Sequence, residues 1–260
     1  MKGGRCFLAA AATAAAAVSA SAARAQTAAD AYYDTAEMAK ARHMLRMHHG
    51  GGATYFLEAE RLEYRSGDDD PLFLWDAQGW YGTDRDKLWL KSEGEALFDG
   101  GLEHGEAQAL YSRAIGGYFD LQGGVRRDFG KGMSRTHAVI GVQGLAPYLF
   151  EIDAAVFVSG HGDVTARVEI EYELLLTQRL ILQPRAELEF AAQNIAELGV
   201  GAGLSSANVG ARLRYEIKRE FAPYVGVSWS RDVGDTADFA RAAGEDPASV
   251  SLVAGVRLWF

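Results

Sequence analysis

The last twelve residues of the chain, Ser249 to Phe260, constrain its fold more than any other stretch. Apolar residues alternate with other residues along this segment, which is the period of a β-strand with two different faces. A soluble edge strand seldom presents so long an apolar face without a protecting charge, whereas in a transmembrane barrel that face meets lipid. The segment therefore predicts a barrel strand, with a strand of a soluble sandwich as the alternative. The apolar row consists of Val250, Leu252, Ala254, Val256, Leu258 and Phe260.

The amino terminus has the pattern of a secretory signal peptide. Lys2 and Arg5 precede an apolar run, and Ala23-Arg24-Ala25 forms a small-residue cleavage site. We therefore predict a signal peptide over residues 1–25. The single cysteine, Cys6, lies within it, so a mature chain would contain neither a disulfide nor a cysteine–metal site. No other apolar run reaches the length of a membrane helix, so such a chain would cross a membrane with strands.

From Thr54 onward the chain consists of alternating segments about as long as a tilted strand that crosses a bilayer. Long connections over 191–206 and 231–248 follow the ninth and eleventh segments, whereas short turns follow the sixth, eighth and tenth. This separation of long loops from short turns is typical of outer-membrane barrels. The alternative is a soluble antiparallel sheet whose charged face is solvated. We predict strands at 54–65, 72–81, 87–98, 103–112, 117–128, 137–145, 148–159, 163–175, 180–190, 207–216, 221–230 and 249–260.

The predicted fold is thus all-β: a transmembrane antiparallel up-and-down β-barrel of about twelve strands over 54–260. Residues 26–53 form a short N-terminal leader, either a helix or a flexible arm. The predicted location is the outer membrane of a Gram-negative cell, with the leader in the periplasm.

The polar row of each predicted strand faces the lumen, which would be mixed in charge but mainly acidic. The chain carries a formal charge of −9, which disfavours nucleic acid and favours cations as partners. Two interpretations remain: a barrel filled with purely structural ion pairs, or a lumen that attracts cations. The acidic candidates are Asp76, Glu93, Glu95, Glu106, Asp120, Asp128, Glu151, Asp153, Glu169, Glu171, Glu173, Glu187 and Glu189. The basic candidates are Lys91, Arg126, Arg167, Arg185, Arg212, Arg214 and Arg257.

The leader contains a dense cluster of soft metal ligands. Thioethers select Cu(I), and imidazoles bind Cu(I), Cu(II) and zinc. In a helix, His43 and Met47 would lie one turn apart, as would Met44 and His48. The alternative is an amphipathic helix in which methionine is apolar filler and histidine occurs by chance. The candidate metal ligands are Met38, His43, Met44, Met47, His48 and His49.

The segment Leu74 to Glu95 predicts a hairpin with a tight turn at Gly82–Asp86, and its three tryptophans fit an interface girdle. The hairpin sequence WDAQGWYGTDRDKLWLKSEGE follows the strand LEAERLEYR and precedes the segments PYLFEIDAAVFVS and RAELEF. In these segments the chain resembles the CopB/PcoB family of copper resistance proteins, over about Thr54 to Phe260.

The resemblance implies an outer-membrane protein with a signal peptide, a copper-binding Met/His-rich leader and a carboxy-terminal barrel. In this chain, that leader corresponds to the six candidate ligands, although it is short and lacks extended methionine repeats. Copper is then the expected ligand, with Cu(I) favoured by methionine and Cu(II) as a further option. The resemblance also implies a periplasmic multicopper oxidase as a partner.

The sequence gives little indication of catalysis. A barrel lipase would need a Ser–His pair near the lipid boundary, and the candidates are His137 beyond Ser134 and His161 beyond Ser159. Neither neighbourhood shows more than the polarity of a strand end, and no nucleotide-binding motif is present. We predict an outer-membrane copper-binding protein that is not an enzyme. The alternatives are a passive cation-attracting porin or structural barrel, and a barrel lipase.

Overall fold

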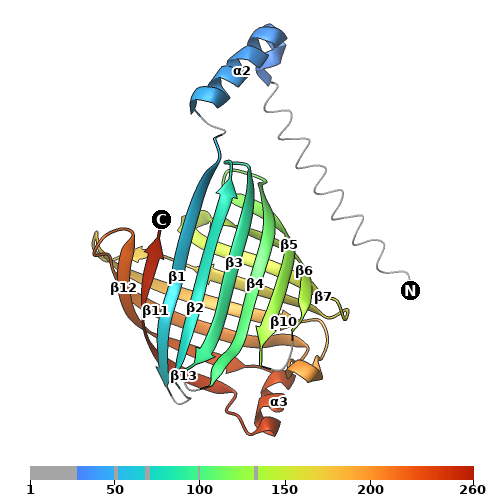
Figure 1. The fold of residues 1–260 in the computed structure, drawn as a ribbon, viewed down its shortest axis with the longest axis vertical. Helices are drawn as coiled ribbons and strands as arrows, with labels where there is room; N and C mark the ends of the chain where they lie inside the picture. Colours follow the sequence, from blue (N-terminus) through green and yellow to red (C-terminus); the bar gives the residue numbers. More distant parts are fainter. Residues whose placement is uncertain (1–27, 50–51, 68–70, 99, 132–133) are drawn as a thin grey trace. The chain divides into compact units, whose positions relative to one another are not determined.

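The computed structural model describes residues 28–49, 52–67, 71–98, 100–131 and 134–260 (Figure 1). They belong to two units, a helical one before Thr54 and a β-sheet one over Thr54–Phe260. The predicted signal peptide, residues 1–25, lies outside the described residues. No helix in the described ranges is long and apolar enough to cross a membrane.

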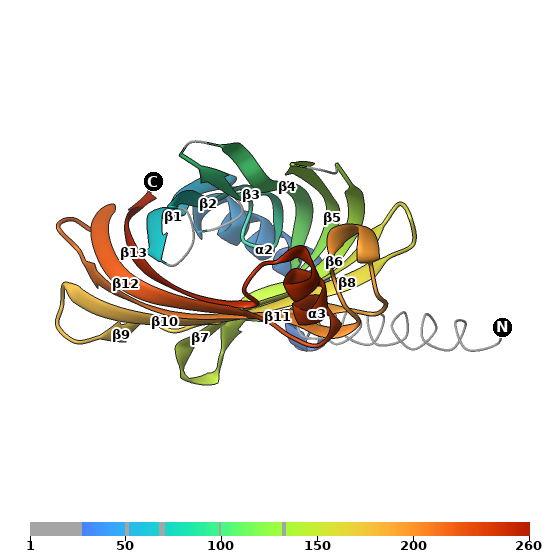
Figure 2. The same ribbon diagram turned by 90° about the horizontal axis from the view of Figure 1, so that it is seen from below.

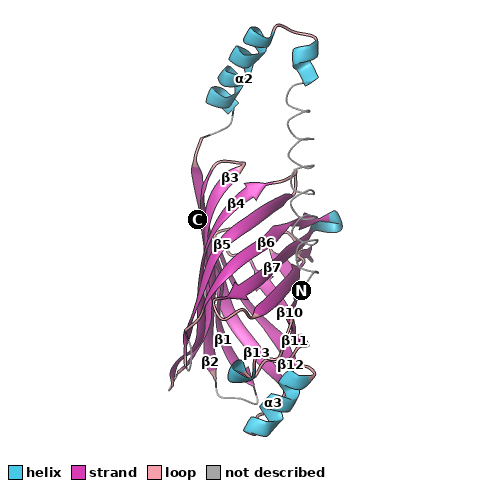
Figure 3. Cartoon of the chain, turned by 90° about the vertical axis from the view of Figure 1, so that its right-hand side faces the viewer, coloured by secondary structure: helices cyan, strands magenta, loops and turns pink. Residues whose placement is uncertain are grey.

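Apart from β8 and β9, which both pair with β10, each strand of the sheet pairs antiparallel with its neighbours in the chain, and the last strand pairs with the first. The pairing of β1 with β13 extends to Phe260, whose amide donates to the Leu57 carbonyl at 2.8 Å. The sheet is therefore a closed barrel, whose tilted strands are visible in Figure 3. The strands are β1 (Thr54–Gly67), β2 (Leu72–Gly82), β3 (Asp86–Leu97), β4 (Gly101–Ala114), β5 (Phe119–Gly130), β6 (Thr136–Ala146), β7 (Phe150–Ser159), β8 (Val164–Glu171), β9 (Leu174–Leu175), β10 (Leu180–Ala191), β11 (Gly203–Tyr215), β12 (Phe221–Asp232) and β13 (Ala248–Trp259).

Strands β8 and β9 occupy one position in the barrel, because both pair with β10. The barrel thus has twelve strand positions, and each corresponds to one predicted segment. The fold prediction is confirmed, including the even strand number that returns both chain ends of the barrel to the same end. We call this end, where β1 begins and β13 ends, the terminal end; the opposite end is the loop end.

Burial is reversed relative to a soluble protein. Apolar residues of the alternating rows are exposed on the outer face; Leu252 is 66% exposed and Ile140 59%. Charged residues of the other rows are buried in the lumen, where Glu63 is 0% exposed. This is the arrangement expected when lipid surrounds the barrel and charged side chains pair with one another inside it.

Exposed tyrosines mark the terminal end of the outer face. Tyr55 lies at the start of β1, Tyr81 at the end of β2 and Tyr215 at the end of β11. Aromatic rings at this level form the interface girdle of an outer-membrane barrel. The predicted girdle role of the hairpin tryptophans is wrong for Trp89, which is 8% exposed and faces the lumen.

Strand β1 contains a bulge that the sequence pattern did not indicate. Its pairing with β2 shifts in register between Ala59 and Arg61, which leaves Glu60 without a partner in the ladder. The bulge changes the phase of the alternation, so that Arg61 and Glu63 are buried in the lumen.

The two long connections lie at the loop end and contain short helices. The connection between β10 and β11 contains η3 (Ala196–Leu198), and that between β12 and β13 contains α3 (Asp235–Ala243). They are joined to each other, because the Gly201 amide donates to Thr236 Oγ1 at 2.9 Å and Asn194 donates to Asp235 at 3.0 Å. Figure 2 shows α3 beside β11 at this end of the barrel. The short turns lie at the terminal end, among them η2 (Pro147–Leu149).

The lipid-facing row predicts how a charge would be tolerated. Replacing Leu252, near the middle of β13, by arginine should lower the free energy of unfolding in lipid vesicles by about 2–4 kcal/mol. The measurement is urea-induced unfolding in vesicles, and Leu252→Met is the matched control, expected to change stability little. Equal stability of Leu252→Arg and wild type would mean that this face meets water.

Candidate functional site

The leader is a helix, one of its two predicted conformations. Helix α2 (Thr35–His49) follows the 3₁₀ turn η1 (Ala28–Ala31). Asp34 caps its amino terminus, because its carboxylate accepts hydrogen bonds from the amides of Ala36 and Glu37 at 2.9 and 3.0 Å. Arg42 forms an ion pair with Asp30, which joins the helix to the preceding turn.

All six predicted copper ligands lie on helix α2. Met38 is partly buried within the leader, and His43 and Met44 are exposed. Met47, His48 and His49 occupy the last turn, and their side chains lie outside what the structure describes. Helical spacing places His43 one turn before Met47, and Met44 one turn before His48.

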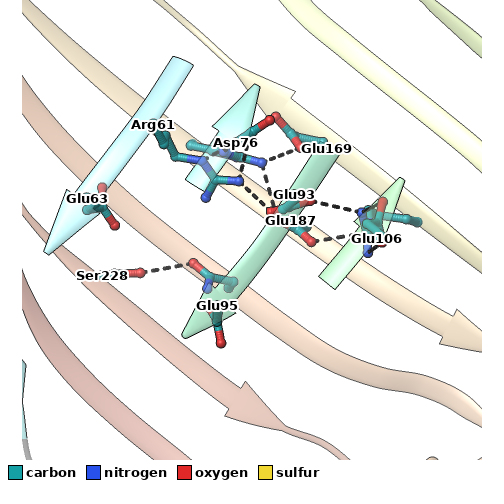
Figure 4. A network of polar contacts seen from close by, with 12 residues as sticks. Arg61, Glu63, Asp76, Glu93, Glu95, Glu106, Glu169, Glu187 and Ser228 are labelled. Carbon is teal, nitrogen blue, oxygen red and sulfur yellow. Dashed lines mark hydrogen bonds and ion pairs between the residues drawn. The ribbon is translucent and has the colours of Figure 1, made fainter. Parts of the chain in front are cut away.

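The centre of the lumen contains a network of ion pairs that joins several strands (Figure 4). Arg61 on β1 contacts Asp76 on β2 at 2.9 Å and Glu93 on β3 at 2.6 Å. Arg167 on β8 contacts Glu93 at 3.2 Å and Glu106 on β4 at 3.0 Å. The network therefore extends across the barrel from β1–β4 to β8.

Other ion pairs line the lumen wall around this network. Glu63 on β1 accepts two hydrogen bonds from Arg212 on β11, at 2.7 and 3.1 Å. Arg257 on β13 contacts Glu58 and Glu173, both at 2.6 Å. The Glu63–Arg212 pair joins strands that are not neighbours in the sheet, and the Arg257–Glu58 pair lies where β13 pairs with β1.

Two cavities remain between these side chains. One, of about 540 Å³, lies towards the terminal end and is lined by ten carboxylates and three cationic side chains. The other, of about 650 Å³, lies towards the loop end and has a nearly balanced lining of charges. Between β3 and β7 the wall is apolar, where Trp89, Leu110, Val139 and Phe157 form a buried cluster.

The structure bears out the predicted lumen residues. Every charged side chain assigned to the lumen lines one of the two cavities or pairs with another lumen residue. Prediction missed Lys87, which lies at the end of its segment, and the inward row of β1. That row is Glu58, Glu60, Arg61, Glu63 and Arg65.

The histidines and serines considered for catalysis take part in local contacts. His137 Nε2 lies 3.0 Å from Asp128 Oδ2, and Ser134 donates to the Asp128 carbonyl at 3.0 Å. In the turn between β7 and β8, Ser159 donates to Asp163 at 3.1 Å. A hydrogen bond from Gln193 lowers the pKa of the Asp163 carboxyl below its usual value. These contacts order turns and strand ends at the loop end.

Within the described ranges, no group of three or more histidine, cysteine, aspartate or glutamate side chains is arranged to hold a metal ion. The carboxylates of the lumen instead face arginine and lysine side chains. The lumen is consequently a charged interior with two cavities. His104 and His137 line the loop-end cavity, whereas the six predicted thioether and imidazole ligands lie on α2.

A closed twelve-position barrel with an apolar outer face and a charged lumen is an outer-membrane β-barrel protein. The solved NanC porin has the same fold, with a TM-score of 0.52 and 13% identity, covering 79% of this chain and 99% of the porin.

Sequence comparison identifies the family. The family model described as Copper resistance protein B precursor (CopB) matches residues 53–260, so the chain belongs to the copper resistance protein B family. Copper resistance protein B of Escherichia coli is 45% identical over 82% of this chain and 71% of its own length. A Copper resistance protein B homolog of Pseudomonas syringae pv. tomato is 45% identical over 83% of this chain and 72% of its own length. Family membership supports a role in copper resistance.

The buried Glu63–Arg212 pair predicts a large effect on stability. Replacing Arg212 by alanine removes one of the two arginines that pair with the buried Glu63 and should lower the free energy of unfolding by about 3–5 kcal/mol. The measurement is urea-induced unfolding in vesicles. Arg113→Ala is the matched control, because its pair with Asp86 is exposed and 3.8 Å long, and it should change stability by less than about 1 kcal/mol. Equal effects of the two variants would contradict a special role for the buried pair.

Proposed function

We propose that the protein is an outer-membrane copper-binding protein that contributes to copper resistance by capturing copper ions with its leader. The observation that carries the proposal is the helix α2, which gives regular spacing to the six thioether and imidazole groups of a copper-resistance family member. Thioethers favour Cu(I), and imidazoles also accept Cu(II), so Cu(I) is the preferred ion and Cu(II) a second one. The ligands are Met38, His43, Met44, Met47, His48 and His49.

The arrangement favours labile binding over a closed cage. Two pairs one turn apart, His43 with Met47 and Met44 with His48, offer two ligands each instead of four converging ones. A site with few ligands releases its ion readily, which suits sequestration or export by exchange. The acidic cavity of the barrel supports a second step in which cations are held or passed in the lumen.

The proposed topology places the terminal end of the barrel, and with it the leader, in the periplasm. Short turns at the terminal end and long connections at the loop end support this direction, because periplasmic turns of outer-membrane barrels are short. Residues 1–25 would be removed as a signal peptide, residues 26–53 would form the leader, and residues 54–260 the barrel. A periplasmic multicopper oxidase is the partner that the family resemblance adds.

The second candidate function is a passive cation-attracting porin or structural barrel whose leader binds no metal. The excess of carboxylates around the terminal-end cavity and the porin fold favour it. The two candidates differ in where copper is bound, so copper stoichiometry distinguishes them.

A leader variant tests the copper proposal. Met38, Met44 and Met47 are replaced by leucine, and His43, His48 and His49 by glutamine, which removes the ligands and keeps good helix formers in most positions. Elemental analysis of the refolded mature protein should find copper in the wild type and none in this variant. Copper tolerance of cells that express the variant should fall accordingly.

The matched control replaces Lys40 and Arg46 of the same helix by glutamine and should retain copper. If the leader variant retained as much copper as the wild type, the site would lie in the barrel and the capture model would be wrong. Absence of copper from wild type and variant alike would favour the passive porin.

A further inference from the structure

The two lumen cavities meet at one level of the barrel. The terminal-end cavity reaches the turns at Asp84 and Tyr118, and the loop-end cavity reaches Lys131 and Asp163. Among the residues that line them, four belong to both, and these mark the junction. The four junction residues are Glu93, Glu106, Phe157 and Arg167.

Arg167 crosses the lumen at this junction. It extends from β8, and its Nη1 donates to Glu93 Oε2 on β3 and to Glu106 Oε1 on β4, both at 3.2 Å. Its Nη2 donates to Glu106 Oε2 at 3.0 Å. Since β4, β5, β6, β7 and β8 follow one another around the wall, these hydrogen bonds span the interior and not a pair of adjacent strands.

Carboxylates surround the Arg167 guanidinium on its own side of the lumen as well. Glu187 and Glu189 on β10 lie 3.4 and 3.2 Å from it. One cation is thus shared among four carboxylates, and its side chain is only 16% exposed. Glu93, Glu106 and Glu187 each have a second arginine partner, so Arg167 is distinguished as the cation that contacts all four carboxylates.

The neighbouring cations hold the junction in place from the wall. Arg126 on β5 contacts Glu106 at 2.8 Å and lies 4.6 Å from the Phe157 ring, and Arg61 contacts Glu93 at 2.6 Å. Each of them fixes a carboxylate that Arg167 also contacts, but neither lines both cavities. Arg167 therefore differs from these two arginines in bordering both cavities.

We propose that the lumen is a cation pathway and that the Arg167 side chain, held by its ion pairs at the junction, closes this pathway. Displacing the Arg167 side chain joins the two cavities and exposes four carboxylates at the junction. A ring of carboxylates attracts cations and repels anions, so the opened pathway is cation-selective. A cation that enters from the acidic terminal-end cavity competes with the guanidinium for Glu93 and Glu106, which provides a means of opening. This proposal does not depend on copper binding by the leader.

The test is single-channel recording in planar bilayers with potassium chloride and no copper. Arg167→Gln should raise conductance at least about threefold over the wild type and shift the reversal potential in a salt gradient towards that of potassium. Arg167→Lys keeps the charge but cannot contact several carboxylates with a planar fork, so its conductance should be intermediate. Heat-modifiable mobility on gels establishes that each barrel is folded.

The matched control is Arg257→Gln. Arg257 also pairs with two lumen carboxylates, Glu58 and Glu173, but it lines neither cavity, so conductance should not change. Wild-type conductance in folded Arg167→Gln would overturn the proposal, as would an equal increase in Arg257→Gln or anion selectivity of the opened channel. If neither Arg167 variant folded, Arg167 would be a structural residue and the proposal would be wrong as well.

Discussion

The pairing of β1 with β13 is the interaction on which the rest of the structure depends. In hydrocarbon no water is available for unpaired amides and carbonyls, so a sheet can cross a membrane only when it has no free edge. The ladder from Glu58–Trp259 to Gly67–Ser251 closes the barrel, and the bulge at Glu60 is accommodated within it. Without this seam, β1 and β13 would each expose a full row of backbone groups to lipid.

Closure has a second consequence, for the side chains. Because alternate residues point to opposite faces, an apolar outer row forces the other row into a lumen of limited width. Charges such as Glu63 and Arg212 are then removed from bulk water and need partners, which they find across the seam. The lumen network is accordingly both a stabilising feature of the barrel and the lining of its cavities. The two interpretations of the lumen that the sequence left open therefore do not exclude one another.

The strands were predictable because their signal is local. Alternation within β8, β10 or β13 depends only on which face meets lipid. The lengths of the connections show which end of the barrel each connection belongs to, and they are read directly from the sequence. The bulge in β1 was not predictable from the sequence. Glu58, Glu60 and Arg61 are all polar, so the alternation of polar and apolar residues does not show where the extra residue is inserted. Helix α3 was missed for a related reason: nine residues in a polar loop are too few for a periodic signal.

The ion pairs of Arg167 could not be predicted from the sequence for a different reason. Its partners Glu93 and Glu106 lie 74 and 61 residues away in the chain. Their meeting is set by the register of every strand between β3 and β8, so one slip would have paired other charges. The inward direction of Arg167 follows from alternation, whereas its position at the junction of two cavities follows only from the closed barrel.

The chemistry of the leader differs from that of the lumen in a way that separates two tasks. Thioether and imidazole groups on α2 prefer soft or borderline ions, whereas lumen carboxylates prefer hard ones. In the proposed function, an ion such as Cu(I) would bind at Met44 or Met47 and would find no comparable ligand among the oxygen atoms that line the terminal-end cavity. Selectivity for copper would then come from the leader, and charge selectivity from the lumen. A barrel that bound copper as tightly as the leader would trap the ion it is proposed to hold or pass, so weak binding in the lumen favours exchange.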